Sequence, residues 1–541
     1  MSLPIYELRV PKQQETMLQQ VTSSCLKLKG KPKKVGQDRL RIMDGKKVSE
    51  IWRQSGGISV ADYSQLWNPK KECARPNKEL LERRLAELGK VIGSLSKGNN
   101  DDVKVEFKRS KPAPSTIVMK YDVRNKTNTK VRELDLQWTC SPKITVRTKG
   151  RQVKQYSLFG GGGEFTCTLG SQGDVIGMCG VWRPIGKLKQ YAKVVSEEEA
   201  DRRYYAILKK DGIRRGKIKL KIERTLGYYS APAAVRQRYL YPVYAYQAVA
   251  RIGEQKVPLQ IVLVPATDFG VETPQRRTTE RSMSCNPELP VDAAKRNCVF
   301  AADDDGKLEV GAVAATAAEN PNVKGFLREA KKICWKTNFD VFGTQAKLAH
   351  WTTKNADFVD ACDLVFYTGH AYSGGWYVDT TGFVKVRRTD AKDNVDVRKD
   401  LWGNDDLEWL VIAACGPLHD KSISPPFIIP DHAAERWADA FDGLHQLLGY
   451  ASVTYAADHL EGKLFLQYCT QPNPLTTIQA WLQAAADSQD SMTPGGEPIW
   501  AGCLYAEQNG KSTVNDHLWG HGPTAKDPKD PDNIYLILSR T

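Results

Sequence analysis

Hydrophobic and polar positions change their period along this chain. Between residues 103 and 148, and again at 217–224 and 241–250, hydrophobic residues recur at every second position. This alternation is typical of short strands with one buried face, and turn-forming residues separate the stretches. We therefore predict a β-rich domain over residues 101–270, built as an antiparallel sheet or sandwich.

Two helices interrupt the polar and basic N-terminal half. The first follows Asn77, a good N-cap, and carries leucines at helical spacing until about residue 98. The second is predicted over 197–210, where Ser196 and Glu199 form a capping box. Residues 1–100 are accordingly expected to form a basic, partly helical N-terminal region.

From about residue 320 the pattern becomes an alternation of apolar strands and helices. Near-continuous apolar runs predict buried strands, which implies a mainly parallel sheet with helices on both faces. The strands are expected at 364–367, 407–414, 451–456 and 498–505, and the helices at 322–335, 432–447 and 475–487. We therefore predict an α/β domain over 320–541, preceded by a polar linker region over 271–319.

Two of these strands end in groups that suit nucleophilic chemistry. The strand at 364–367 is followed by Thr368, Gly369 and His370, and the strand ending at Ala414 is followed by Cys415. Reactive groups gather at the carboxyl ends of parallel strands. If these two strands are parallel neighbours, the imidazole can take the proton of the thiol and activate it for attack on a carbonyl.

Backbone N–H groups beside the two side chains suit the oxyanion that such an attack creates. Those of Ala371 and Cys415 are the expected donors, because both lie at the predicted edge of the sheet. Small residues around the sulfur, including Ala414 and Gly416, leave room for a substrate.

The two blocks resemble the caspase-like clan of cysteine peptidases, which includes caspases, metacaspases, legumain, gingipains and separase. The first block reads DLVFYTGHA and the second WLVIAACGPL, with Ala371 at the position where the clan usually has glycine. The resemblance implies that His370 is the base and Cys415 the nucleophile. A nearer likeness, to an uncharacterised family of microbial caspase-like domains, covers roughly the last 300 residues and implies no substrate.

Acidic residues near the predicted dyad offer a possible substrate pocket. Asp363, Asp379 and Asp405 are the candidates, with Asp406 beside the last of them. Some members of the clan use such a carboxylate to bind a basic side chain of the substrate. Turn and capping roles are the commoner reason for an aspartate at these positions.

Charge is divided unevenly between the two halves. Residues 1–250 hold 50 Lys and Arg against 24 Asp and Glu, while the remainder holds 28 against 39. The basic half could bind nucleic acid or another anionic polymer, although no recognised motif organises it. The chain lacks a signal peptide and a long apolar run, and its 12 cysteines show no CxxC pair, so we expect a cytoplasmic protein with free thiols.

The remaining histidines suggest no cofactor. His445 has apolar neighbours and is expected to be a hydrogen-bonded core residue. His517 and His521 have a spacing that suits a metal on a helix, but the glycines and Pro523 around them favour a loop. A phosphate-binding loop and a serine-hydrolase elbow are both absent from the sequence, and neither a metal nor a cofactor is predicted.

The sequence therefore leads to a cysteine endopeptidase hypothesis. His370 and Cys415 would hydrolyse peptide bonds in protein substrates. The basic N-terminal half would serve as a recognition or regulatory module that could bind a regulatory protein partner. Two alternatives stay open: a catalytically inactive caspase-like scaffold that binds proteins, and anionic-polymer binding through residues 1–250. A membrane partner is not expected.

Overall fold

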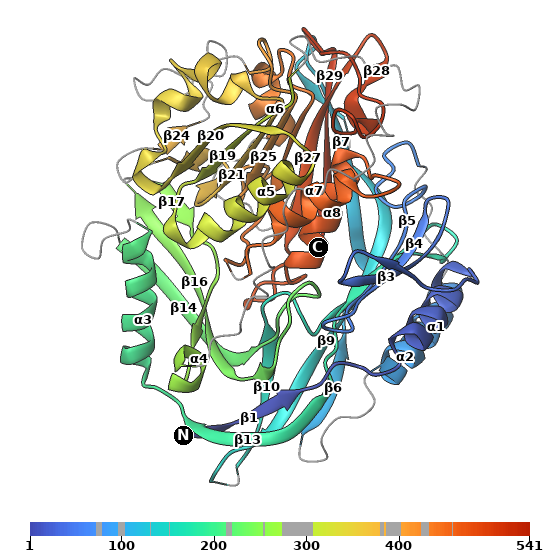
Figure 1. Ribbon diagram of the computed structural model, residues 1–541, viewed down its shortest axis with the longest axis vertical. Coiled ribbons are helices and arrows are strands. Elements are labelled where there is room, and N and C mark those ends of the chain that lie inside the picture. The colour runs from blue at the N-terminus through green and yellow to red at the C-terminus, as the bar shows by residue number, and fades with distance from the viewer. Residues whose placement is uncertain are drawn as a thin grey trace.

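The computed structural model is strand-rich, with one large mixed sheet and helices packed against it (Figure 1). It describes the whole chain except residues 72–77, 96–102, 130, 151, 212–218, 253–254, 273–306, 379–382, 386–401, 424–431 and 457. The architecture is thus broadly α/β, as the sequence predicts for the C-terminal part.

The C-terminal sheet carries five parallel strands followed by two antiparallel ones. Its strand order is β20-β19-β21-β25-β26-β27-β29. The bounds are β19 Glu309–Ala314, β20 Lys336–Phe342, β21 Leu364–Thr368, β25 Trp409–Ala413, β26 Gln446–Tyr450, β27 Trp500–Gln508 and β29 Asn533–Arg540.

Alternate residues of these strands enter two separate cores. On one face, residues such as Phe366 and Val411 pack against α5, α7 and α8, which lie side by side across the sheet (Figure 1). On the other face, Val365 and Ile412 join a cluster that contains four fully buried tryptophans. Burial on both faces explains why the strands read as continuous apolar runs. The helices are α5 Asn320–Lys332, α6 Ala433–Trp437, α7 Glu461–Thr470 and α8 Thr477–Ser488.

The sheet does not stop at the boundary between the two halves. Strand β29 pairs antiparallel with β7, and the ladder continues through β9, β11, β12, β5, β4, β3 and β2. The bounds are β2 Lys33–Val35, β3 Arg39–Asp44, β4 Lys47–Trp52, β5 Ile58–Asp62, β7 Ala113–Asp122, β9 Arg132–Arg147, β11 Phe165–Leu169 and β12 Val175–Gly180. The β-rich half and the α/β half therefore share backbone hydrogen bonds.

Of the other N-terminal strands, β6, β8 and β10 pair with strands of this sheet, and the rest form smaller ladders. Strand β14 pairs with β16, which also pairs with β17 and β18, and β1 pairs with β13 and β15. The bounds are β1 Ser2–Leu8, β6 Lys104–Arg109, β8 Thr127–Asn128, β10 Val153–Phe159, β13 Ile185–Lys193, β14 Lys219–Tyr229, β15 Tyr239–Leu240, β16 Pro242–Ile252, β17 Gln255–Pro258 and β18 Val262–Pro265. The helices are α1 Gln14–Leu26, α2 Lys78–Leu95, α3 Glu197–Lys210 and α4 Asp268–Glu272. Ser196 caps α3 as predicted, since its hydroxyl accepts a hydrogen bond from the Glu199 N–H.

Several predicted boundaries are wrong. Strand β19 lies inside the predicted linker region, so the α/β domain begins about ten residues earlier than expected. The helix predicted over 432–447 ends near residue 440, and the strand expected at 451–456 is instead β26. Residues 444–448 (LHQLL) are all buried, and periodicity alone does not distinguish a buried strand from a buried helix. Among the helices described, none combines the length and the apolar character needed to cross a membrane.

Candidate functional site

His370 and Cys415 follow neighbouring strands that run in the same direction. Strands β21 and β25 pair in parallel, and Thr368 is the register partner of Ala413. His370 lies two residues beyond Thr368, and Cys415 lies two residues beyond Ala413. Since paired strands are about 4.8 Å apart, both residues leave the sheet at its carboxyl edge, although the His370 ring nitrogens make no hydrogen bond to the Cys415 sulfur in this structure.

The two loops that carry these residues are in contact. A Cβ atom added to Gly416 would lie 3.7 Å from the Cα of Tyr372 and 3.7 Å from the N of Ser373. Gly416 has a φ of 70°, a conformation that favours glycine, and its N–H donates a hydrogen bond to the Ser452 carbonyl. Gly416 therefore allows the loop that follows β25 to approach the loop that follows β21 closely.

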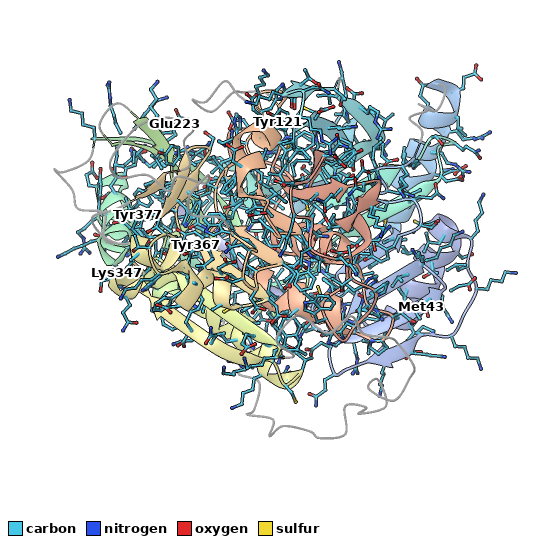
Figure 2. The ribbon with its side chains drawn as sticks, turned by 90° about the horizontal axis from the view of Figure 1, so that it is seen from above. Met43, Tyr121, Glu223, Lys347, Tyr367 and Tyr377 are labelled. Atoms are coloured by element: carbon cyan, nitrogen blue, oxygen red, sulfur yellow. The ribbon has the colours of Figure 1, made fainter. Side chains whose placement is uncertain are left out.

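The His370 ring is buried without a hydrogen bond. Only 5% of His370 is exposed, and neither ring nitrogen has a partner within the described part of the chain. Its carbonyl accepts hydrogen bonds from the Tyr367 hydroxyl and the Tyr377 N–H, and these two tyrosines lie near each other in Figure 2. Burial lowers the pKa of His370 to about 4, although the Glu319 charge opposes the shift, so the ring is neutral at pH 7.

Cys415 is also fully buried, against a threonine. The Thr454 N–H donates to the Cys415 Sγ at 3.4 Å, and the Thr454 hydroxyl oxygen lies 3.5 Å from the same sulfur. Burial raises the pKa of the thiol to about 11, while the two Thr454 contacts partly oppose this. The sulfur is therefore a neutral thiol at pH 7 in this arrangement, not a thiolate paired with an imidazolium.

A buried carboxylate, Glu319, lies beside the pair and was not found from the sequence. Its Oε2 atom is 3.0 Å from the His459 Nδ1 and 2.8 Å from the Thr368 hydroxyl. Burial alone would raise the pKa of Glu319, but His459 and hydrogen bonds from Thr368 and Gln260 outweigh it and lower the pKa to about 2. Glu319 thus supplies a fixed negative charge that acts on both His370 and Cys415.

The geometry of the two proposed oxyanion donors is unstrained. Ala371 begins the short strand β22, Ala371–Tyr372, and its φ is not positive, so alanine fits where the clan usually has glycine. One residue earlier, the Tyr377 N–H of β23, Gly375–Tyr377, donates a hydrogen bond to the His370 carbonyl. In an antiparallel ladder hydrogen-bonded and non-hydrogen-bonded pairs alternate, so the Ala371 N–H points away from β23. The Cys415 N–H has no backbone acceptor among the described residues.

The acidic residues predicted for the substrate pocket do not lie at this edge. Asp363 comes immediately before β21, at the opposite end of the strand from His370, and its carboxylate accepts the Glu309 N–H at 2.6 Å. Asp405 is exposed and precedes β25, again at the amino end of the sheet. Asp379 lies outside the described residues. The pocket prediction is therefore wrong for Asp363 and Asp405, because it relied on nearness in sequence and ignored the direction of the strands.

Asp363 belongs to a different acidic group at that amino end. Carboxylate oxygens of Glu309, Asp363 and Asp406 lie within 4.8 Å of one another. Glu309 is paired with Lys336, whose Nζ lies 3.1 Å from it. The length of the strands separates this group from the dyad.

The other histidines take structural positions. His445 is fully buried, and its Nδ1 lies 2.7 Å from an Asp516 oxygen while its Nε2 lies 3.4 Å from an Asp527 oxygen. The predicted core role of His445 is thereby confirmed. His517 lies in a loop, as expected, with its Nδ1 3.3 Å from the Pro523 carbonyl.

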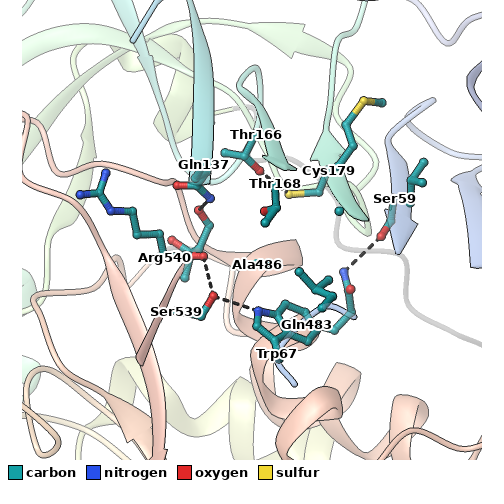
Figure 3. A pocket seen from close by; sticks show the side chains of 15 residues that line it. Ser59, Trp67, Gln137, Thr166, Thr168, Cys179, Gln483, Ala486, Ser539 and Arg540 are labelled. Atoms are coloured by element: carbon teal, nitrogen blue, oxygen red, sulfur yellow. Dashed lines mark hydrogen bonds between the residues drawn. The ribbon is translucent and has the colours of Figure 1, made fainter. Parts of the chain in front are cut away.

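The cavity shown in Figure 3 lies elsewhere in the molecule. It opens between N-terminal strands and the C-terminal residues, where Trp67 donates to the Ser539 hydroxyl and Gln483 donates to the Ser59 hydroxyl. Neither His370 nor Cys415 lines it. Both side chains are buried, so the candidate dyad is covered in this structure.

Comparisons with known proteins match a family model to only part of the chain. Residues 310–540 match a family model described as Domain of unknown function (DUF6345). No curated protein matches. Among solved structures, an uncharacterised protein from Eubacterium rectale ATCC 33656 is 8% identical, with 52% of this chain and 87% of that chain covered and a TM-score of 0.28. The matched range contains both His370 and Cys415, and the family description names no activity.

Proposed function

We propose that this chain is a caspase-like cysteine peptidase in which Cys415 is the nucleophile and His370 the general base. The observation that carries the proposal is the register of the two strands, in which Thr368 pairs with Ala413. That pairing brings a thiol and an imidazole to one sheet edge from blocks 45 residues apart, in the arrangement that the resemblance to the clan requires.

The chemistry follows from the groups at this edge. His370 takes the proton from Cys415, and the sulfur attacks the carbonyl carbon of a peptide bond. The resulting oxyanion is stabilised by the N–H groups of Ala371 and Cys415. His370 then gives the proton to the leaving amine, which breaks the C–N bond, and water hydrolyses the thioester.

A catalytically inactive scaffold is the second candidate. The burial of both side chains and the neutral state of both groups favour it, because a thiol with a raised pKa is a poor nucleophile. The two candidates differ in one observable property. A peptidase must be able to expose Cys415 and activate it, whereas a scaffold has no such requirement.

An active-site-directed probe separates the candidates. We expect a peptide that carries an electrophilic group in place of the scissile carbonyl to label Cys415 covalently, and to do so at least about tenfold faster than it labels the exposed Cys334. Peptide mapping by mass spectrometry gives the labelled position. Labelling that is absent from Cys415, or that equals the reaction with Cys334, would refute the peptidase and favour the scaffold.

A further inference from the structure

A segment of the N-terminal half lies directly over the carboxyl edge of the C-terminal sheet. This covering segment, residues 259–261, connects β17 to β18. The Ile261 N–H donates to the Thr454 carbonyl at 2.8 Å, and the Ala456 N–H donates to the Ile261 carbonyl at 2.9 Å. Ile261 and Tyr455 thereby form a parallel bridge. The covering segment is held by the same loop whose Thr454 contacts the Cys415 sulfur.

Side chains of the covering segment reach both parts of the candidate site. Ile261 is fully buried in the apolar cluster that contains Cys415. Gln260 hydrogen-bonds with its side chain to Glu319, the carboxylate that acts on His370 and Cys415. The neighbouring β17 lies against β22, which carries Ala371. One short segment therefore packs in the same apolar cluster as the nucleophile, contacts the fixed charge and flanks the histidine loop.

This arrangement is the way in which an extended peptide binds to a sheet edge. Main-chain hydrogen bonds hold such a peptide, and alternate side chains enter pockets. Here Ile261 provides one N–H and one carbonyl to the loop and directs its side chain toward the cluster of Cys415. An extended peptide that binds at this edge would use the same backbone partners, Thr454 and Ala456, and would enter the same apolar cluster.

We propose that the covering segment is an autoinhibitory occupant of the peptide-binding edge, and that an extended peptide substrate must displace it before Cys415 can react. The proposal rests on the proposed peptidase function and adds its regulation. Displacement would admit water and substrate to the two side chains and remove the burial that keeps both groups neutral. Two main-chain hydrogen bonds join the segment to the loop of Thr454, and such a local contact can open without unfolding of the sheet.

The test measures the accessibility of the Cys415 thiol in the folded full-length chain. The variant Ile261→Ala shortens a side chain in the cluster that contains Cys415, and Gln260→Ala removes the contact with Glu319. Val262→Ala is the matched control, because Val262 is the adjacent buried aliphatic residue and packs in a different cluster. Alkylation by iodoacetamide is followed by mass spectrometry, with the buried Cys469 and Cys503 as references for global unfolding.

We expect Cys415 to be alkylated at least about tenfold faster in Ile261→Ala than in the wild type, while Val262→Ala stays within about twofold. The rates at Cys469 and Cys503 should not change. Equal Cys415 rates in all variants, or a wild-type rate equal to that of the exposed Cys334, would overturn the proposal. If Ile261→Ala exposes all three buried thiols, the chain has unfolded, and the Gln260→Ala result decides by the same criterion.

Failure of the covering role and failure of the peptidase function give different results. If Cys415 becomes reactive in Ile261→Ala but no peptide is cleaved, the segment covers the site and the peptidase proposal fails. If the wild type and Ile261→Ala cleave peptides at the same rate, the peptidase proposal holds and the autoinhibitory role is wrong.

Discussion

Replacement of Cys415 by alanine is expected to reduce peptide hydrolysis by at least about a thousandfold, because the proposed mechanism forms the acyl-enzyme on the Cys415 sulfur. His370→Ala should lower the rate by about 10²–10⁴-fold, the usual range for a general base. Both variants should be assayed in the wild-type chain and in the Ile261→Ala background, where the site is expected to be open. Initial rates with fluorogenic peptides provide the measurement.

Two matched controls separate chemistry from folding. Cys503→Ala removes a buried thiol from β27, which is separated from β25 by β26, and His521→Ala removes a histidine from a loop. Both should retain most of the activity. Hydrolysis that survives unchanged in Cys415→Ala, or that falls equally in the controls, would count against the proposed roles.

The second large effect is expected from His459, whose Nδ1 lies 3.0 Å from the buried Glu319 carboxylate. Removing one partner of a buried pair leaves an uncompensated charge, which typically costs about 3–5 kcal/mol. His459→Ala should therefore lower the free energy of unfolding by about this amount at pH 7. Urea denaturation followed by tryptophan fluorescence measures the loss.

A double replacement identifies the source of that loss. If the cost comes from the stranded charge, His459→Ala combined with Glu319→Gln should be more stable than His459→Ala alone. The half-buried His350, which stacks on Phe358, offers a control whose replacement by alanine should cost little. Additive effects of the two replacements would contradict the coupling.

Acid should remove the contribution that the Glu319 carboxylate makes to the free energy of unfolding. The pKa of Glu319 is lowered to about 2 from an ordinary value of 4.5, so its contribution to stability is present above about pH 4.5 and is lost as pH falls toward 2. The stability difference between the wild type and Glu319→Gln should therefore narrow across that window. A difference that stays constant down to pH 2 would show that the carboxylate is not stabilised in this way.

The strands that carry the dyad could be predicted because burial on both faces produces a distinctive sequence. The apolar runs before His370 and Cys415 have few other interpretations once turn residues bound them. Strand adjacency was a hypothesis, and the register between Thr368 and Ala413 is the observation that supports it. Local sequence patterns do not show which residues from distant parts of the chain lie near the dyad.

Two parts of the site illustrate that limit. Glu319 is a single acid in a segment that looked like a linker, and only the fold brings it to Thr368 and His459. The covering segment falls within the predicted β-rich domain, and nothing in its sequence shows that Ile261 packs in the same cluster as Cys415. Conversely, Asp363 is adjacent to the strand of His370 in sequence, but a strand of five residues places it at the other end.

The N-terminal half contributes more than its charge suggests. Its sheet continues the C-terminal sheet through the pairing of β29 with β7, and its β16–β18 unit holds the covering segment. We therefore propose a recognition or regulatory role for this half because it contacts the candidate site. Its positive charge is a separate property, and the covering role does not depend on it.

The pairing of His370 with Cys415 is tested most directly by the pH dependence of Cys415 alkylation. Rates are measured from pH 4 to 11 in Ile261→Ala, with and without His370→Ala. A functional pair predicts an inflection well below the ordinary thiol pKa of 9.0, and its movement upward by more than one pH unit when His370 is removed. An inflection at or above 9 that is the same in both variants would contradict the pairing.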